Sequence, residues 1–150
     1  MLQFIVSSFL VLIASLFQTT SLFLIGGVKP NLALVFIVAI SNFEKTWVRR
    51  VILVLLAALI LTFAPFATWI DIIFISATLF AVALLDYLPW QRIVNGVVVV
   101  SAATIILNLP GLNFGIIVLE LIMNIILVSV FTLLLGIFYG TKKAQKKNRF

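Results

Sequence analysis

Long runs of apolar residues follow one another along this chain, and only short polar joints separate them. A helix needs about 20 mostly apolar residues to cross a bilayer. The pattern predicts six transmembrane helices, with approximate bounds 2–25, 32–43, 48–64, 68–88, 93–109 and 114–139. The second run is short for a span, so a shorter hairpin or a partly re-entrant segment over 32–64 is the alternative. Five spans would place the N-terminus outside.

The joints contain residues that end helices. Gly26 and Gly27 follow the first run, and Pro110 follows the fifth. Joints of only a few residues make successive helices antiparallel neighbours. We therefore predict an all-α, polytopic membrane helical bundle over residues 1–140, followed by a basic cytoplasmic tail over residues 141–150.

The basic residues are distributed unevenly about this predicted topology. Six spans place only Lys29 on one side and gather the other nine on the opposite side: Lys45, Arg49, Arg50, Arg92, Lys142, Lys143, Lys146, Lys147 and Arg149. Lys and Arg are enriched in cytoplasmic loops. The bias predicts a multi-pass protein with both termini in the cytoplasm. The tail is interpreted as a topology anchor that also attracts anionic lipid, and not as a nucleic-acid site.

Composition supports the membrane class and limits the chemistry. The chain is 65% hydrophobic and 9% charged, whereas soluble domains carry about 25% charged residues. It has no cysteine and no histidine, so it lacks thiolate nucleophiles, the commonest general base and the commonest transition-metal ligand. No phosphate-binding loop, HExxH or GxSxG motif is present. We expect neither an enzyme nor a resident metal or cofactor.

One acidic residue, Glu120, lies clearly inside an apolar run, where charged groups are costly and often functional. Asn124 is four residues further on and shares its helix face. Ser101, Thr104 and Asn108 on the preceding helix could face this pair. One hypothesis is an ion, proton or ligand site. The other, which we favour, is an acid that ties two helices together by hydrogen bonds.

The first helix carries several small polar residues. Ser8, Ser15 and Thr19 fall on one face at spacings of seven and four, and Gln18 flanks them. Such residues let helices approach closely and bond across the contact. We interpret this face as a packing surface, and a lined cavity as the alternative.

Two further pairs of residues lie near the predicted cytoplasmic ends of helices. Gly136 and Gly140 have the GxxxG spacing, which can mark a close helix contact or a dimer face and leaves a homo-oligomer open. Asp86 and Arg92 flank Trp90, and we expect them to form an interfacial ion pair.

The beginning of the chain contains LFQTTS at residues 16–21 and GGVKPNLAL at residues 26–34. In these two segments it resembles the MreD family of rod shape-determining membrane proteins. That family commonly opens with an apolar helix ending in Gln and small polar residues, then a Gly and a Pro-Asn-Leu or Pro-Asp-Leu element. The chain departs from the pattern at residues 51–58, which lack the glycines of the family's third helix. A divergent member, or a different family, therefore remains open.

The resemblance implies a non-enzymatic component of the cell-elongation machinery in the bacterial inner (plasma) membrane. Members of the family act with the single-span partner MreC and the actin-like MreB, and help to position peptidoglycan synthesis at the lateral cell wall. The family is also similar in fold to the S component of energy-coupling factor transporters. That similarity gives the alternative, a small-molecule-binding membrane subunit of such a transporter, for which Glu120, Asn124 and Gln18 are the candidate polar site.

Overall fold

The computed structural model describes residues 2–20, 24–63, 69–111 and 113–147. This part of the chain is all-helical, with six α-helices and one short 3-10 turn. The helices are α1 (Leu2–Thr19), α2 (Leu32–Ser41), α3 (Trp47–Leu61), α4 (Trp69–Tyr87), α5 (Arg92–Asn108) and α6 (Phe114–Lys147).

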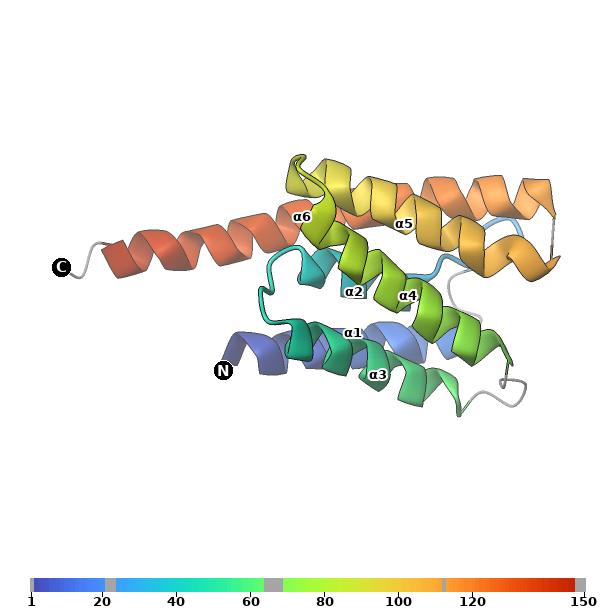
Figure 1. The fold of residues 1–150 in the computed structure, drawn as a ribbon, viewed down its shortest axis with the longest axis horizontal. Helices are drawn as coiled ribbons and strands as arrows, with labels where there is room; N and C mark the ends of the chain where they lie inside the picture. Colours follow the sequence, from blue (N-terminus) through green and yellow to red (C-terminus); the bar gives the residue numbers. More distant parts are fainter. Residues whose placement is uncertain (1, 21–23, 64–68, 112, 148–150) are drawn as a thin grey trace.

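The helices alternate in direction, so the connections gather at two ends of the molecule (Figure 1). The α2–α3 and α4–α5 connections and the beginning of α1 lie at one end, which we call the basic end because it carries Lys45, Arg49, Arg50 and Arg92. Lys29 and the α5–α6 connection lie at the other end, which we call the distal end. The expected antiparallel order of neighbouring helices is confirmed.

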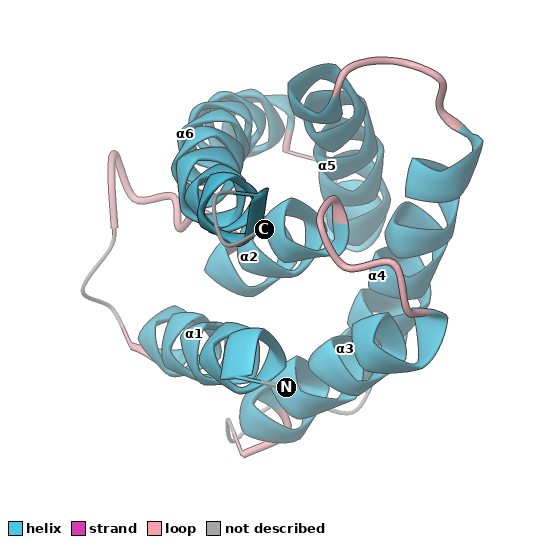
Figure 2. Cartoon of the chain, turned by 90° about the vertical axis from the view of Figure 1, so that its left-hand side faces the viewer, coloured by secondary structure: helices cyan, strands magenta, loops and turns pink. Residues whose placement is uncertain are grey.

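Helix α2 forms the centre of the bundle (Figure 2). Nine of its ten residues are buried, as expected of a helix that is apolar on every face. Around it, successive contacts run from α1 to α3, α4, α5 and α6. Within the described residues, the backbones of α6 and α1 do not meet, so the five outer helices form an open ring around α2.

The residues just before α2 form a separate turn and do not continue the first helix. Helix α1 ends at Thr19, about six residues earlier than expected. The chain then makes a tight turn in which Ile25 and Val28 exchange both backbone hydrogen bonds, at 2.9 and 3.0 Å. Gly26 and Gly27 form this turn with φ of 60° and 79°, a conformation that glycine adopts without steric strain. The turn lets the chain re-enter the bundle and begin α2 inside it.

Within the described residues, two stretches are long and apolar enough to cross a membrane, Arg92–Gly111 and Phe114–Tyr139, so the predicted count of six spans is not confirmed. Helices α1 and α2 are apolar but shorter. Helix α6 continues to Lys147 and so includes most of the expected tail. Lys and Gln favour helix, and cations are stabilised near a helix C-terminus. Of residues 140–147 only the helical backbone is described, and Arg149 lies outside the described residues.

Candidate functional site

Polar residues of α5 and α6 meet inside the distal half of the bundle. The side-chain nitrogen of Asn108 donates to Glu120 Oε2 at 2.9 Å. The side-chain nitrogen of Asn124 donates to Thr104 Oγ1 at 3.0 Å and to Glu120 Oε1 at 3.5 Å. Two of the three residues expected to face Glu120 and Asn124 therefore do so. Ser101 makes no side-chain hydrogen bond within the described part of the chain.

The same group of residues caps the N-terminus of α2. Asn124 Oδ1 accepts the backbone N–H of Asn31 at 2.9 Å, and Asn31 Oδ1 accepts that of Leu34 at 3.1 Å. Gln18 Oε1 on α1 accepts the N–H of Ala33 at 2.8 Å. The first N–H groups of a helix have no partner within it, and here side chains from α1 and α6 supply partners. We call this set the distal polar network: Gln18, Asn31, Thr104, Asn108, Glu120 and Asn124.

Contacts with backbone groups determine which side-chain atom donates and which accepts in the hydrogen bonds of this network. Asn124 Oδ1 must face the N–H of Asn31, so the nitrogen of this amide points towards Glu120. Asn108 Nδ2 also donates to the carbonyl of Thr104 at 2.9 Å, which sets the orientation of the second amide. Both carboxyl oxygens of Glu120 therefore face N–H donors. Asn124 and Thr104 are fully buried, and Glu120 is nearly so.

The network joins four helices, α1, α2, α5 and α6. A cavity of about 320 Å³ lies beside it, lined by Ile73, Leu107, Asn108, Pro110 and Gly111. Asn108 is the only member of the network in that lining. The other polar atoms of the network are directed at one another, an arrangement that stabilises helix contacts.

Two of the other three expected residues of α1, Ser15 and Thr19, bond locally, whereas the hydroxyl of Ser8 is buried without a hydrogen-bond partner among the described residues. Ser15 donates to the carbonyl of Val11 at 2.8 Å, and Thr19 to that of Leu16 at 2.7 Å. Gln18, which only flanks the serine face, is the residue that reaches α2. Asn31 was not singled out as a site residue, although its position directly before an apolar run is a signature of a helix N-cap.

The opening between α1 and α6 forms a long apolar groove. A cavity of about 440 Å³ and a second of about 300 Å³ share Leu10, Phe36 and Phe131 in their linings. Phe36 of α2 forms part of the floor, and its ring lies 4.1 Å from that of Phe131. We call this surface the α1/α6 groove. Its linings are Leu10, Ile13, Ala14, Phe17, Ile25, Pro30, Leu32, Phe36, Met123, Ile126, Leu127 and Phe131 in the first cavity, with Gln3, Val6, Ser7, Leu134, Leu135, Phe138 and Tyr139 added in the second.

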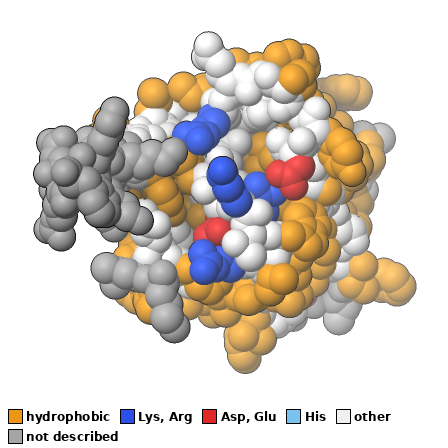
Figure 3. All heavy atoms as spheres, turned by 60° about the vertical axis from the view of Figure 1, so that its left-hand side comes forward, with side chains coloured by type: hydrophobic (Ala, Val, Ile, Leu, Met, Phe, Trp, Pro, Cys, Tyr) orange, Lys and Arg blue, Asp and Glu red, His pale blue; other side chains and the backbone are white. Residues whose placement is uncertain are grey.

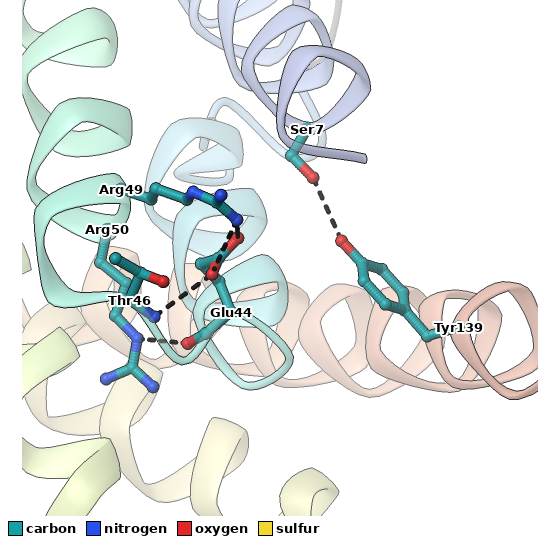
Figure 4. Close-up of polar contacts among 6 residues, drawn as sticks. All are labelled: Ser7, Glu44, Thr46, Arg49, Arg50 and Tyr139. Atoms are coloured by element: carbon teal, nitrogen blue, oxygen red, sulfur yellow. Dashed lines mark hydrogen bonds and ion pairs between the residues drawn. The ribbon is translucent and has the colours of Figure 1, made fainter. Parts of the chain in front are cut away.

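A single polar contact crosses the groove within the described residues. The hydroxyls of Ser7 and Tyr139 lie 3.3 Å apart near the basic end (Figure 4). The rest of the lining is almost entirely apolar. The groove therefore suits an apolar occupant that enters from the side of the bundle.

Charged side chains gather on the face at the basic end (Figure 3). Arg50 is buried, donates to the Glu44 carbonyl at 2.6 Å and pairs with Asp86 at 2.7 Å. Arg49 pairs with Glu44 at 3.3 Å, and the N–H of Thr46 donates to the same carboxylate (Figure 4). Burial raises the pKa of Glu44, but the hydrogen bonds from Thr46 and Arg49 and the charge of Arg49 outweigh it, so the pKa lies below its ordinary value.

The expected ion pair between Asp86 and Arg92 is wrong. Asp86 pairs with Arg50 of α3 instead. The guanidinium of Arg92 lies over the ring of Phe43, 4.7 Å from its centroid. Asp86 is on the last turn of α4 and Arg92 begins α5, and the intervening connection separates the two side chains.

The predicted close helix contact at Gly136 and Gly140 can be checked only at Gly136. A Cβ at Gly136 would lie 3.8 Å from the ring of Phe43, an ordinary van der Waals distance. Gly136 therefore faces the end of α2 within the same chain. The surroundings of Gly140 lie outside the described residues.

The described residues contain no group of three or more His, Cys, Asp or Glu side chains that could hold a metal ion. No protein-family model, curated protein or solved structure matches the chain. Function must therefore be argued from the groove, the distal polar network and the basic end.

Proposed function

We propose that this protein is a non-enzymatic, six-span component of the bacterial inner membrane that docks a partner's transmembrane helix in the α1/α6 groove. The observation that carries the proposal is the open ring. Five helices surround α2, yet the half-buried Phe36 and the neighbouring Leu32 of α2 line a cavity that opens between α1 and α6. Helices associate in membranes mainly by close packing, and a groove with an aromatic floor offers such packing to one more helix.

The proposed topology follows from the alternation of the helices and from charge. The basic end carries Lys45 in a connection, Arg49, Arg50 and Arg92 at the beginnings of helices, and the basic end of α6. This charge bias supports a cytoplasmic location for that end. The short helix α2 is surrounded by protein, so it need not span the lipid by itself. Irregular backbone at membrane depth is tolerated where protein buries it, which accommodates the turn before α2.

The sequence resemblance to the MreD family supports a role in the cell-shape and elongation machinery. Under this proposal the occupant of the groove is the single-span, MreC-like partner, and the assembly works with an MreB-like filament to position lateral peptidoglycan synthesis. The resembling residues Gln18, Asn31 and Leu32 all lie at the entry of α2 into the bundle. Of these three, Leu32 lines the groove, together with the neighbouring Pro30.

The alternative is a small-molecule-binding subunit of an energy-coupling-factor-type transporter. The observation in its favour is the cavity of about 320 Å³ at the distal end, which reaches Asn108 beside Glu120. Ligand sites need a few convergent polar groups. This cavity offers Asn108 and little else of that kind, so the docking proposal is better supported.

Affinity purification of the tagged protein from native membranes in mild detergent, followed by mass spectrometry, tests the proposal. We expect wild type to recover a single-span membrane partner together with proteins of wall synthesis. Phe131→Ala should lose them because it removes part of the groove. The matched control Phe80→Ala, on an exposed position of α4, should retain them. Recovery of a transmembrane coupling subunit with paired ATPases would instead support the transporter alternative.

A further inference from the structure

A further pocket lies at the basic end, on the side of the bundle away from the α1/α6 groove. It has a volume of about 370 Å³ and lies between the beginning of α5 and the middle of α6, at residues 132–137. We call it the Arg92 pocket, after the charged residue in its lining, and its other lining residues include Phe43, Thr132, Leu133, Gly136 and Ile137.

Arg92 is held in place but keeps its charge available. Its guanidinium lies 4.7 Å from the centroid of the Phe43 ring, and that ring stacks on Tyr139 at 5.0 Å. The two ion pairs among the described residues use Arg49 and Arg50, so no carboxylate neutralises Arg92 there. A guanidinium presents five N–H donors in a planar fork that fits phosphate.

A buried hydroxyl in the same pocket lacks a hydrogen-bond partner. Thr132 is only 3% exposed, and its Oγ1 has no partner within the described residues. Asn42 Nδ2 is also buried without one. A Cβ at Gly96 would lie 3.1 Å from Asn42 Nδ2, 3.3 Å from Val128 Cγ2 and 3.7 Å from Thr132 Oγ1, so both polar atoms lie close to Gly96 of α5. Buried polar groups almost always have a partner, which points to a polar group bound here.

The pocket continues onto apolar surface. Leu133 is 54% exposed on α6, and Ile137 follows it one turn later. A ligand that fits both parts has a negatively charged head and an apolar chain. Anionic lipids of the cytoplasmic leaflet have this chemistry, and basic pockets between transmembrane helices on that side bind their head groups.

We propose that the Arg92 pocket binds one anionic phospholipid, with its phosphate on Arg92 and the Thr132 hydroxyl and an acyl chain along Leu133 and Ile137. The inference rests on the membrane placement given under the proposed function, and it is independent of partner docking. The site would give the basic end a specific lipid contact in addition to the general attraction of its charges.

The test uses the full chain with Trp47→Phe and Trp69→Phe, which leaves Trp90, just before α5, as the only tryptophan. The protein is reconstituted in phosphatidylcholine vesicles containing phosphatidylglycerol, with the acyl chains of one or the other lipid brominated. Circular dichroism checks that each variant is folded. Quenching of Trp90 by the two brominated lipids gives the preference of the site for phosphatidylglycerol.

We expect a clear preference in the parent protein and a drop of about fivefold in Arg92→Gln, as for one basic residue at an anionic surface. Thr132→Val, which removes only the hydroxyl, should lower it by about twofold or more. Lys45→Gln removes one charge from the same end outside the pocket and should leave the preference unchanged. The pocket is excluded as the site if the parent shows no preference or if Arg92→Gln and Lys45→Gln behave alike.

Inorganic phosphate in the buffer should not displace the lipid, because it lacks the acyl chain; displacement would overturn the lipid assignment. Phosphatidylglycerol is present in both leaflets of these vesicles, so the result does not depend on orientation. Failure of the partner purification would leave this measurement unaffected, and the two proposals can therefore fail separately.

Discussion

The side-chain oxygen of Asn124 on α6 accepts the backbone N–H of Asn31 at 2.9 Å, directly before the first turn of α2. This bond allows a helix to begin inside the bundle, where water cannot satisfy its N–H groups. It also fixes the rest of the distal polar network, because the Asn124 amide then points its nitrogen at Thr104 and Glu120.

Replacing this amide should therefore destabilise the bundle. Asn124→Leu leaves the Asn31 N–H without its acceptor, and it removes the N–H groups that Asn124 donates to Thr104 Oγ1 and to Glu120 Oε1. We expect the free energy of unfolding to fall by about 1–3 kcal/mol, the cost of leaving a buried polar group unpaired. Titration with sodium dodecyl sulfate, followed by circular dichroism, measures it.

Helix α1 contains two glutamines, one that caps α2 and one that does not, so the loss of the capping bond can be compared with the loss of an amide alone. Gln18→Leu removes the acceptor of the Ala33 N–H and should be destabilising in the same range. Gln3→Leu, which has no side-chain hydrogen bond among the described residues, should change stability by less than about 0.5 kcal/mol. Equal effects of the two changes would show that the capping bond contributes nothing.

Glu120 and Asn108 should be energetically coupled. Both carboxyl oxygens of Glu120 face amide N–H groups, and the shorter bond, 2.9 Å, comes from Asn108. A double-mutant cycle with Glu120→Leu and Asn108→Leu should give an interaction energy of about 0.5–2 kcal/mol. Additive single effects would contradict the contact. If the role is structural, Glu120→Leu should weaken stability yet retain the partner proteins.

Replacing the two arginines near the beginning of α3 should change the free energy of unfolding by very different amounts. The side chain of Arg50 is 8% exposed and holds both the Glu44 carbonyl and Asp86, whereas that of Arg49 is 43% exposed. Arg50→Gln should lower the free energy of unfolding by about 1–3 kcal/mol. Arg49→Gln should cost less than about 1 kcal/mol, as is usual for exposed ion pairs. The same detergent titration distinguishes them, and equal losses would argue against the buried role of Arg50.

The proposed six-span topology can be tested directly, because the chain contains no cysteine. Single cysteines at Thr46 and Gln91 should react with a membrane-impermeant maleimide only after the cells are permeabilised. A cysteine at Lys29 should react in intact cells. Labelling of all three positions from the same side would contradict the proposed orientation.

The sequence predicted the order and the direction of the helices, because hydrophobic runs and the joints between them are local signals. It also predicted that Thr104 and Asn108 face Glu120 and Asn124, since spacing places each pair on one helix face. The central position of α2 and the opening between α1 and α6 depend on which helices pack together, and an apolar run does not specify its neighbours. The Arg50–Asp86 pair joins residues 36 positions apart, so sequence proximity favoured the wrong partner, Arg92.

The central claim is that the α1/α6 groove receives a partner helix. The most direct test is photo-crosslinking in living cells with benzoylphenylalanine at Leu10, which lines both parts of the groove, and at Leu59, which is exposed on α3 as the matched control. The account predicts that Leu10 crosslinks to one single-span membrane protein and that Leu59 does not. Equal crosslinking from both positions, or no protein adduct from Leu10, would contradict it.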